Sequence, residues 1–241
     1  MSKEYDQITA EHYAAYRPNL HETILNQYFK GEKSYRLGLD VGCGVGQSAI
    51  ALTSFCEQVI GIEPSRAMLS QAIPHPKVTY QHYDGLSFDF PDHHFDVITF
   101  AGSLFYAKSP ALLDEVIRVC QNEAVVVLYD FDLSLDFVLK ALGVTLSEPA
   151  IAYDHQANFD DLPSNYLIHQ KEIQQSINIS IAIENIAHLL LSVQSSYVEI
   201  AKIFEVNNLH QHVTEKLSTI FESNNLIVAT KTYLTTYQII K

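Results

Sequence analysis

The sequence is poor in cysteine and contains no long apolar run. Its 241 residues include three widely spaced cysteines, Cys43, Cys56 and Cys120. An odd, scattered set of thiols suits a reducing cytoplasm better than a disulfide framework. No apolar run reaches the roughly 20 residues that a membrane helix requires, and residues 1–6 do not place an apolar segment behind a basic start, as a signal peptide would. We therefore expect a cytoplasmic protein with no membrane partner.

Positive charge is also scarce. The chain carries 15 Lys and Arg against 28 Asp and Glu, so its formal net charge is −13 at pH 7. A nucleic-acid-binding protein needs a basic groove to neutralise phosphates, and no Lys/Arg cluster here is longer than two residues. We therefore expect no nucleic-acid partner. A small-molecule substrate remains compatible, because one nearby arginine can outweigh a distant negative field once water is excluded.

The composition that remains is that of a globular α/β protein, with 47% hydrophobic and 18% charged residues. A chain of this length can bury a substantial core in a single domain, 1–241. In its first half, short apolar runs alternate with helical stretches, the pattern of a parallel sheet with crossover helices. The runs that predict strands are residues 36–41, 58–62, 78–82, 95–100 and 124–129, and those that predict helices are 23–29, 46–54, 65–71 and 111–120.

Beyond Tyr129 the rhythm changes. We expect a helix over residues 132–142, an irregular stretch over 147–169 and a strand over 175–183. A helix or helix pair follows at 186–206, then a helix at 209–223 and a last strand at 226–240. Residues 131–173 are the best candidate for an insertion that caps the carboxyl edge of the sheet. The apolar run 186–193 suits a helix core, and a homodimer surface is the alternative.

The most informative stretch is a glycine-rich loop. An apolar strand ends in Asp40 and continues through Gly42, Gly44 and Gly46 directly into a helix. Glycine permits positive φ and lets a ligand approach the backbone closely. Open α/β sheets bind ligands at the carboxyl ends of their strands, where the strand order reverses. The loop therefore predicts a binding site, and a glycine turn without a ligand is the plainer alternative.

The spacing of the glycines separates two kinds of cofactor. A nicotinamide site has the pattern GxGxxG, with a helix N-terminus facing the pyrophosphate. This chain has GxGxG instead, and Gln47 stands at the third glycine position of the dinucleotide pattern. The acidic Asp40 before the first glycine suits a cofactor with an ammonium group and no phosphate. The loop therefore favours a nucleoside-amino acid over a dinucleotide.

Two further strand ends carry carboxylates. Glu63 follows the second predicted strand, where one ionised carboxylate can accept hydrogen bonds from both hydroxyls of a ribose. Asp84 follows the third, where it can accept from an adenine amino group while Tyr83 offers a flat apolar surface. An ordinary Asp-Gly turn is the alternative at Asp84.

These motifs together resemble the class I S-adenosylmethionine-dependent methyltransferases. Residues 40–46, Glu63, Asp84 and the strand 94–100 occur in the family's order, and the similarity covers roughly residues 5–130. The resemblance implies a Rossmann-like, doubly wound seven-stranded sheet that is mostly parallel, with the last strand antiparallel. It also implies S-adenosylmethionine as cofactor and S-adenosylhomocysteine as product. The residues expected to bind the cofactor are Asp40, Gly42, Cys43, Gly44, Gly46, Glu63, Pro64, Met68, Asp84, Gly85 and Ala101.

A looser similarity concerns the start of the chain. Residues 5–18 resemble the lid of the small-molecule branch that includes trans-aconitate methyltransferases, so we expect residues 1–30 to form an N-terminal lid. The chain departs from its relatives before the fifth strand, where Gln121-Asn122-Glu123 replaces the usual Pro-Gly-Gly turn. Asn122 can still make a turn, so this departure bears on loop shape more than on activity.

Four residues are candidates for the acceptor side of the site. Arg17 could hold a substrate carboxylate with two hydrogen bonds, and Tyr13 could close over the cofactor. After the fourth strand, Ser103 and Tyr106 could line the transfer site. The Asn/Asp-Pro-Pro-Tyr motif of nucleic-acid and glutamine N-methyltransferases is missing there, which argues against amide and base-amino acceptors. Each of the four could instead have a packing or surface role.

The expected cap adds two further candidates. Tyr153 and His155 lie in the irregular stretch over 147–169, so either could contact the substrate. The other histidines are less informative, because residues 93–94 lie in a polar turn and residues 210–212 open a helix. The cysteines lie far from both of these histidine pairs, so we expect no metal site.

The expected function is therefore methyl transfer to a small molecule, with a carboxylate or a hydroxyl as the accepting group. A sulfonium methyl is already activated, so the protein mainly aligns the reactants and excludes water. The alternatives are a non-catalytic binder of S-adenosylmethionine or S-adenosylhomocysteine, and another transferase such as an aminopropyl transferase. A nicotinamide oxidoreductase ranks below both.

Overall fold

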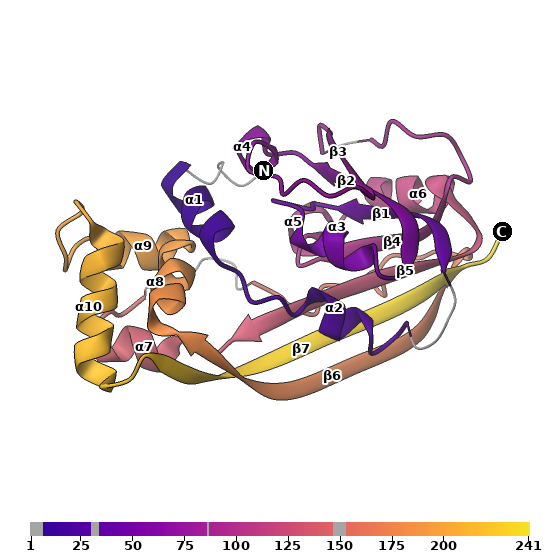
Figure 1. Cartoon of the computed structure of the whole chain (residues 1–241). Coiled ribbons are helices and arrows are strands. Elements are labelled where there is room, and N and C mark those ends of the chain that lie inside the picture. Colours follow the sequence, from indigo (N-terminus) through magenta and orange to yellow (C-terminus); the bar gives the residue numbers. More distant parts are fainter. Residues whose placement is uncertain (1–6, 30–33, 86, 147–152) are drawn as a thin grey trace.

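The computed structural model describes residues 7–29, 34–85, 87–146 and 153–241 of the chain (Figure 1). Its centre is a seven-stranded sheet with the order β3-β2-β1-β4-β5-β7-β6. Strand β7 runs antiparallel to both of its neighbours, and the pairs among β1 to β5 are parallel. The predicted doubly wound fold with an antiparallel last strand is therefore confirmed. The strands are β1 (Tyr35–Val41), β2 (Cys56–Glu63), β3 (Val78–His82), β4 (Phe95–Ala101), β5 (Cys120–Leu133), β6 (Leu167–Ala182) and β7 (Asn225–Ile239).

Apolar side chains cover both faces of the central strands. In β5, Val126 and Leu128 pack against α6 (Pro110–Val119) on one face. Val125 and Val127 point to the other face, toward α2 (His21–Leu25) and α3 (Gln47–Leu52). This alternation follows from the two-residue period of a strand, so a continuous apolar run is needed when helices cover both sides. The central sheet is therefore packed on both faces, and its strands place the loops at its carboxyl edge.

Three strands are much longer than the others and carry a helical cap. β5, β6 and β7 continue past the end of β4, and four helices pack together at their far end (Figure 1). These helices share a third core, in which Ile186, Leu190 and Val213 are fully or almost fully buried. The run 186–191 is thus part of the core of the cap. The four helices are α7 (Asp136–Ala141), α8 (Ile183–Leu191), α9 (Gln194–Ile200) and α10 (Leu209–Phe221).

Two element boundaries differ from the predicted ones because of pairing between the long strands. The helix predicted over 132–142 begins only at Asp136, because β5 pairs with β7 as far as Leu133. The strand predicted over 175–183 begins earlier, at Leu167, because it pairs with β7 from Ile239 onward. In the segment predicted as an insertion, residues 131–133 and 167–173 thus belong to the sheet, and residues 147–152 lie outside the described residues.

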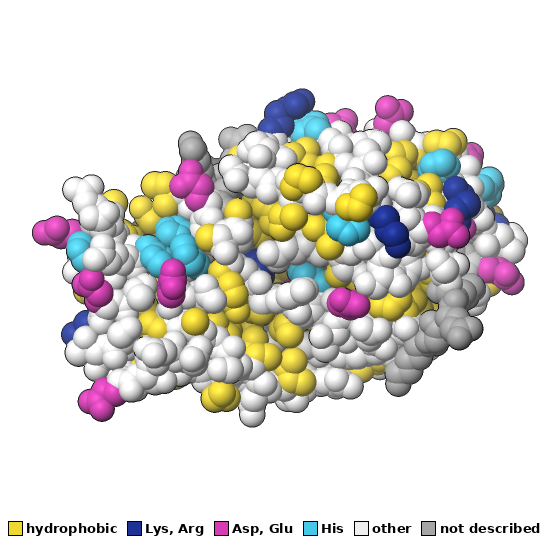
Figure 2. All heavy atoms as spheres, in the orientation of Figure 1, with side chains coloured by type: hydrophobic (Ala, Val, Ile, Leu, Met, Phe, Trp, Pro, Cys, Tyr) yellow, Lys and Arg dark blue, Asp and Glu magenta, His cyan; other side chains and the backbone are white. Residues whose placement is uncertain are grey.

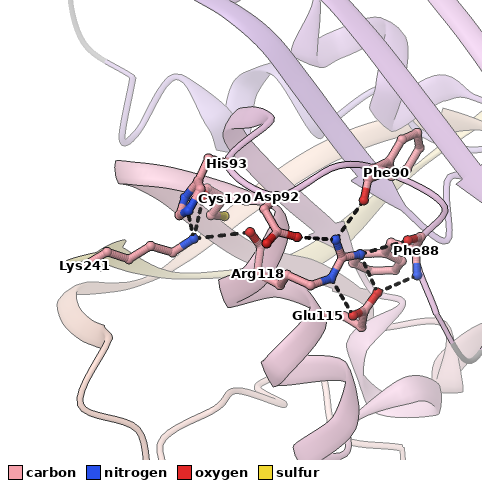
Figure 3. Close-up of polar contacts among 8 residues, drawn as sticks. All are labelled: Phe88, Phe90, Asp92, His93, Glu115, Arg118, Cys120 and Lys241. Carbon is pink, nitrogen blue, oxygen red and sulfur yellow. Dashed lines mark hydrogen bonds and ion pairs between the residues drawn. The ribbon is translucent and has the colours of Figure 1, made fainter.

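A polar network fixes the amino edge of the sheet, opposite the glycine loop (Figure 3). The guanidinium of Arg118, on α6, donates to both carboxylate oxygens of Glu115 and to Asp92. It also donates to the carbonyl oxygens of Phe88 and Phe90. The hydrogen bonds to Glu115 and Asp92 raise the pKa of Arg118. This one side chain therefore fastens the 88–92 loop to α6.

None of the helices in the described part of the chain has both the length and the apolar character needed to span a membrane.

Candidate active site

The glycine loop after β1 has the left-handed backbone that its sequence predicts. Gly42, Gly44 and Gly46 have φ of 72°, 54° and 96°. A Cβ atom at Gly46 would lie 2.0 Å from the hydroxyl oxygen of Tyr80, and one at Gly42 would lie 2.5 Å from Cβ of Ser103. At Gly44 the nearest side chain is Tyr13, at 4.0 Å. Packing therefore requires two of the three glycines, and Gly44 is the one at which an added Cβ would meet no clash.

Asp40, in β1, anchors the strand that leads into this loop. Its carboxylate is completely buried and accepts hydrogen bonds from the hydroxyls of Ser48, at 2.5 Å, and Thr99, at 2.7 Å. Burial raises the pKa of Asp40 to about 6, although both hydrogen bonds oppose the shift. The side chain therefore holds β1, β4 and the start of α3 in register. Its expected contact with the cofactor remains a prediction.

Glu63 lies at the end of β2, beside the glycine loop. One of its carboxylate oxygens accepts from the backbone N–H of Gly44 at 3.0 Å, and the other from that of Ser65 at 2.9 Å. Burial raises the pKa of Glu63, and the hydrogen bonds from Ser65 and Gly44 act against this rise. Each carboxylate oxygen has a further lone pair. The group is therefore fixed at the sheet edge and can still accept from a diol.

The third predicted element lies next to the second. Burial, together with the charges of Glu63 and Asp84, raises the pKa of Tyr83 to about 12. The two carboxylates therefore lie close enough to the Tyr83 hydroxyl to act on it. Asp84 is exposed, and one of its oxygens accepts from the backbone N–H of Ser87 at 3.3 Å. Gly85 has φ of 83° and open space around it. The structure thus brings the glycine loop, Glu63 and the Asp84 turn to one edge.

The remaining predicted cofactor residues have different exposures. Cys43 is buried, with Sγ 2.8 Å from the position of a Cβ at Gly61, so only its backbone borders the loop surface. Pro64 is exposed and Met68, on α4 (Arg66–Leu69), is buried. Ala101 is half-buried at the end of β4. Their roles in binding remain predictions, but the elements that carry the predicted cofactor residues meet at the carboxyl edge.

Helix α1 (Gln7–Ala15) crosses the site as a lid would. Tyr13 and Ala14 pack against Val45 of the loop and Met68 of α4. The guanidinium of Arg17 lies over the ring of Tyr13, at 4.7 Å from its centroid. It also lies 5.4 Å from the ring centroid of Phe131 in β5. The described part of the predicted lid, residues 7–29, thus contacts both the glycine loop and Phe131 of β5.

The last turn of α1 also contacts helices α8 and α10 through histidines. Nδ1 of His12 lies 2.9 Å from Nδ1 of His188, and the rings of His188 and His210 stack with centroids 3.9 Å apart. Figure 2 shows histidine side chains gathered on the surface where α1 meets α8 and α10. Burial and the charge of His210 lower the pKa of both His12 and His188, to about 4 for His188. His12 and His188 therefore pack in their neutral form.

Of the acceptor-side candidates after β4, one has a structural task. The hydroxyl of Ser103 donates to the carbonyl oxygen of Val41, and Ser103 Cβ packs against Gly42. Ser103 therefore connects the β4 loop to the glycine loop. Tyr106, on α5 (Leu104–Ala107), is 61% exposed, and its ring lies 5.6 Å from that of Tyr153. Catalytic roles for Tyr13, Arg17, Ser103 and Tyr106 remain predictions.

Tyr153 and His155, the two candidates from residues 147–169, meet a residue that the sequence did not single out: Asp130 in β5, one position past the end of the neighbouring β4. Asp130 accepts hydrogen bonds from the hydroxyl of Tyr153 at 2.9 Å and from the backbone N–H of Phe131 at 2.8 Å. Its Oδ2 also lies 2.7 Å from Nδ1 of His155. The Tyr153 hydroxyl lies 2.6 Å from the carbonyl oxygen of Gly102 as well. The position of Asp130 at a strand's carboxyl end was the available signal, and only the fold shows which distant residues meet it.

No group of three or more His, Cys, Asp or Glu side chains in the described residues is arranged to hold a metal ion.

Comparison with known proteins agrees with this geometry. Residues 39–128 match a methyltransferase domain family. The chain is 27% identical over 97 residues to a predicted methyltransferase of Dictyostelium discoideum, a match that covers 40% of this chain and 37% of the relative. It is 40% identical over 62 residues to the predicted S-adenosylmethionine-dependent methyltransferase CRG1 of Saccharomyces cerevisiae, covering 25% and 21%. The chain thus matches well under two thirds of either relative.

Solved structures agree over a longer stretch. A predicted type II methyltransferase from Anaeromyxobacter dehalogenans superposes with a TM-score of 0.63 at 18% identity, covering 94% of this chain and 98% of that one. A phosphoethanolamine N-methyltransferase of Haemonchus contortus, solved with phosphomonomethylethanolamine and S-adenosylhomocysteine, gives a TM-score of 0.56 at 16% identity and covers 99% and 59%. Residues 39–128 of the chain thus match a methyltransferase domain, and the chain as a whole shares its fold with solved methyltransferases.

Proposed function

We propose that this protein binds S-adenosylmethionine at the edge formed by the glycine loop, Glu63 and Asp84, and transfers its methyl group to a small-molecule acceptor. The observation that carries the proposal is the left-handed glycine loop beside the carboxylate of Glu63, which the backbone N–H groups of Gly44 and Ser65 hold in place. A Cβ at Gly44 would touch Tyr13 at 4.0 Å without a clash, whereas a Cβ at Gly42 or at Gly46 would overlap the side chain of Ser103 or of Tyr80. The residues present therefore fit a nucleoside-amino acid that lies along the loop.

Each residue of the site has a task that its contacts allow. Glu63 would accept hydrogen bonds from the ribose hydroxyls, since both its oxygens have a further lone pair. Asp84 would accept from the adenine amino group, and Tyr83 would cover the ring. Asp40 bonds to Ser48 in the helix after the loop, and Ser103 bonds to the backbone of Val41 just before it, so both hold the loop in place. When bound, the cofactor supplies a methyl group that its sulfonium has already activated.

The lid would keep water away from the transfer site. Tyr13 and Met68 pack over the loop, and Arg17 stacks on Tyr13 and Phe131. Exclusion of water strengthens the interactions of charged groups inside the site and prevents side reactions. The scarcity of positive charge over the chain supports a small acceptor over a nucleic acid. Formation of a homodimer stays a prediction.

Calorimetry tests the cofactor half of the proposal. The wild-type protein should bind S-adenosylmethionine and S-adenosylhomocysteine and show no response to NAD. Glu63→Ala should weaken binding of both by at least about tenfold, which is about 1.4 kcal/mol. NAD binding without a response to the sulfonium would overturn the proposal. Release of S-adenosylhomocysteine in the presence of small phenols, amines and acids tests turnover.

A further inference from the structure

Asp130 and His155 have the arrangement of an acid–base pair, beside the carboxyl end of β4. Asp130 pairs in register with Tyr233 on β7. The preceding residue, Tyr129, pairs with Ala101 at the end of β4. Asp130 therefore stands one residue past the point where β4 stops, at the same carboxyl edge as the proposed cofactor site.

A short chain of contacts connects this group with the glycine loop. The Tyr153 hydroxyl donates to Asp130 and also lies within hydrogen-bond distance of the carbonyl oxygen of Gly102. Ser103, the next residue after Gly102, packs against Gly42 of the glycine loop. Contacts through Tyr153, Gly102 and Ser103 therefore link the pair to the glycine loop.

The geometry of the pair selects one form of the imidazole. Nδ1 of His155 lies 2.7 Å from Oδ2 of Asp130, and an ionised carboxylate can only accept. Nδ1 therefore carries the proton. Nε2 lies 3.8 Å from Oδ1 of Asp132, which is beyond hydrogen-bond reach. In the neutral ring, Nε2 is then the basic nitrogen.

The surroundings hold the ring in place and keep it reachable. The ring of Tyr233 stacks on that of His155 at an interplanar angle of 14°, and the ring of Tyr153 meets it edge-on at 76°. The side chain of His155 is 29% exposed and that of Asp130 is 12% exposed. A cavity borders the pair, and its lining includes Gly102 and Tyr153. An acceptor in this cavity would meet His155.

The charges around the pair favour one class of acceptor. Burial lowers the pKa of His155, but the hydrogen bond and charge of Asp130 raise it. The charges of Asp132 and Asp154 add to the rise, so the net shift is upward. Three carboxylates near one imidazole repel an anionic acceptor and tolerate a neutral or cationic one.

We propose that His155, positioned by Asp130, is the general base of the reaction, and that the acceptor is a hydroxyl or an amine that loses a proton on methylation. The inference rests on the proposed function. His155 Nε2 takes the proton from the acceptor atom as that atom forms its bond to the methyl carbon. The methyl–sulfur bond breaks, and its electron pair stays on sulfur. A carboxylate acceptor would need no base, so the pair narrows the acceptor class.

The first test needs no acceptor. The imidazole of His155 is titrated by NMR in the wild-type protein and in Asp130→Asn, with Asp132→Asn as the matched control. We expect the titration midpoint of His155 to fall in Asp130→Asn by more than it falls in Asp132→Asn. Equal midpoints in the wild type and Asp130→Asn would overturn the pairing, whatever the protein's activity.

The second test follows the release of S-adenosylhomocysteine with p-cresol, benzylamine and benzoate, which share one ring and differ in the accepting group. We expect turnover of p-cresol or benzylamine, and a loss of kcat of about 10²–10⁴-fold in His155→Asn. Asparagine can keep a hydrogen bond to Asp130 but cannot accept the proton. In Asp130→Asn the acid limb of the pH profile should move to lower pH.

The outcomes separate this inference from the proposed function. Turnover of benzoate alone, undiminished turnover in His155→Asn, or no turnover of any probe by a protein that still binds S-adenosylmethionine would overturn the inference. A wild-type protein that does not bind S-adenosylmethionine would instead overturn the proposed function. Retained affinity for S-adenosylhomocysteine in His155→Asn shows that the variant is folded.

Discussion

Gly44→Ala separates a glycine needed for the ligand from one needed only for the turn. Gly44 has φ of 54°, and the nearest atom to an added Cβ is Cε1 of Tyr13 at 4.0 Å. The substitution therefore meets no steric clash within the protein. Its cost to folding is the left-handed backbone alone, about 1–2 kcal/mol. In a chain of this size, each kcal/mol lowers Tm by roughly 2–4 °C.

Gly143→Ala is the matched control. Gly143 also has a positive φ, 76°, with no atom within 4 Å of an added Cβ, and it follows α7 in the cap. Both variants should lose similar stability in a thermal scan. Only Gly44→Ala should lose affinity for S-adenosylhomocysteine in calorimetry, by at least about tenfold, or about 1.4 kcal/mol. Equal affinity in the two variants would refute the placement of the ligand along the loop.

Other substitutions test the supports of the site. Arg118→Met should lower the free energy of unfolding in urea by about 1–3 kcal/mol, because charged hydrogen bonds are lost. The affinity for S-adenosylhomocysteine should stay unchanged, and a loss of affinity would contradict the position of Arg118 away from the proposed cofactor site. Asp84→Ala should weaken cofactor binding in calorimetry, and unchanged affinity would remove it from the site. Burial raises the pKa of Asp40 to about 6 in the folded protein, so folding favours the protonated carboxyl. The free energy of unfolding should therefore fall by about 2–3 kcal/mol as the pH rises from below 4 through 6. Asp40→Asn should lack this loss in urea unfolding at the two pH values. For His188, a pKa lowered to about 4 means that stability is lost as pH falls below 6.5; in limited proteolysis, acid should expose α1 in the wild type and less so in His188→Gln.

The central sheet could be predicted because its signals are local. The run 78–82 predicted β3 with the observed bounds, and the glycine spacing predicted a turn with positive φ. The ends of β5 and β6 could not be predicted, because long-range pairing with β7 extends them past the points where their own sequences stop looking like strands. Local propensity is a weak guide where a neighbouring strand decides.

The candidate site divides in the same way. The position of Glu63 was predictable because it follows a local strand signal, and parallel neighbouring strands end at the same edge; the structure places it beside Gly44. Ser103 was a candidate because of its position after β4, but its hydroxyl is used by the carbonyl of Val41. That use depends on how closely two loops approach, which no spacing in the sequence reveals.

The long strands explain why the acceptor side was the harder half to predict. β5 continues past the edge where β4 ends, so Asp130 lies where the sheet passes from the cofactor loops toward the cap. Tyr153 and His155 reach it from residues 153–166, a described stretch of turns and bends without a helix or strand. The shape of the glycine loop and of the Asp84 turn depends on local turns at strand ends. The shape of the proposed acceptor side depends on which distant segment packs beside Asp130. The acceptor is therefore the part of the proposed function that depends on long-range contacts, which no local pattern in the sequence reveals.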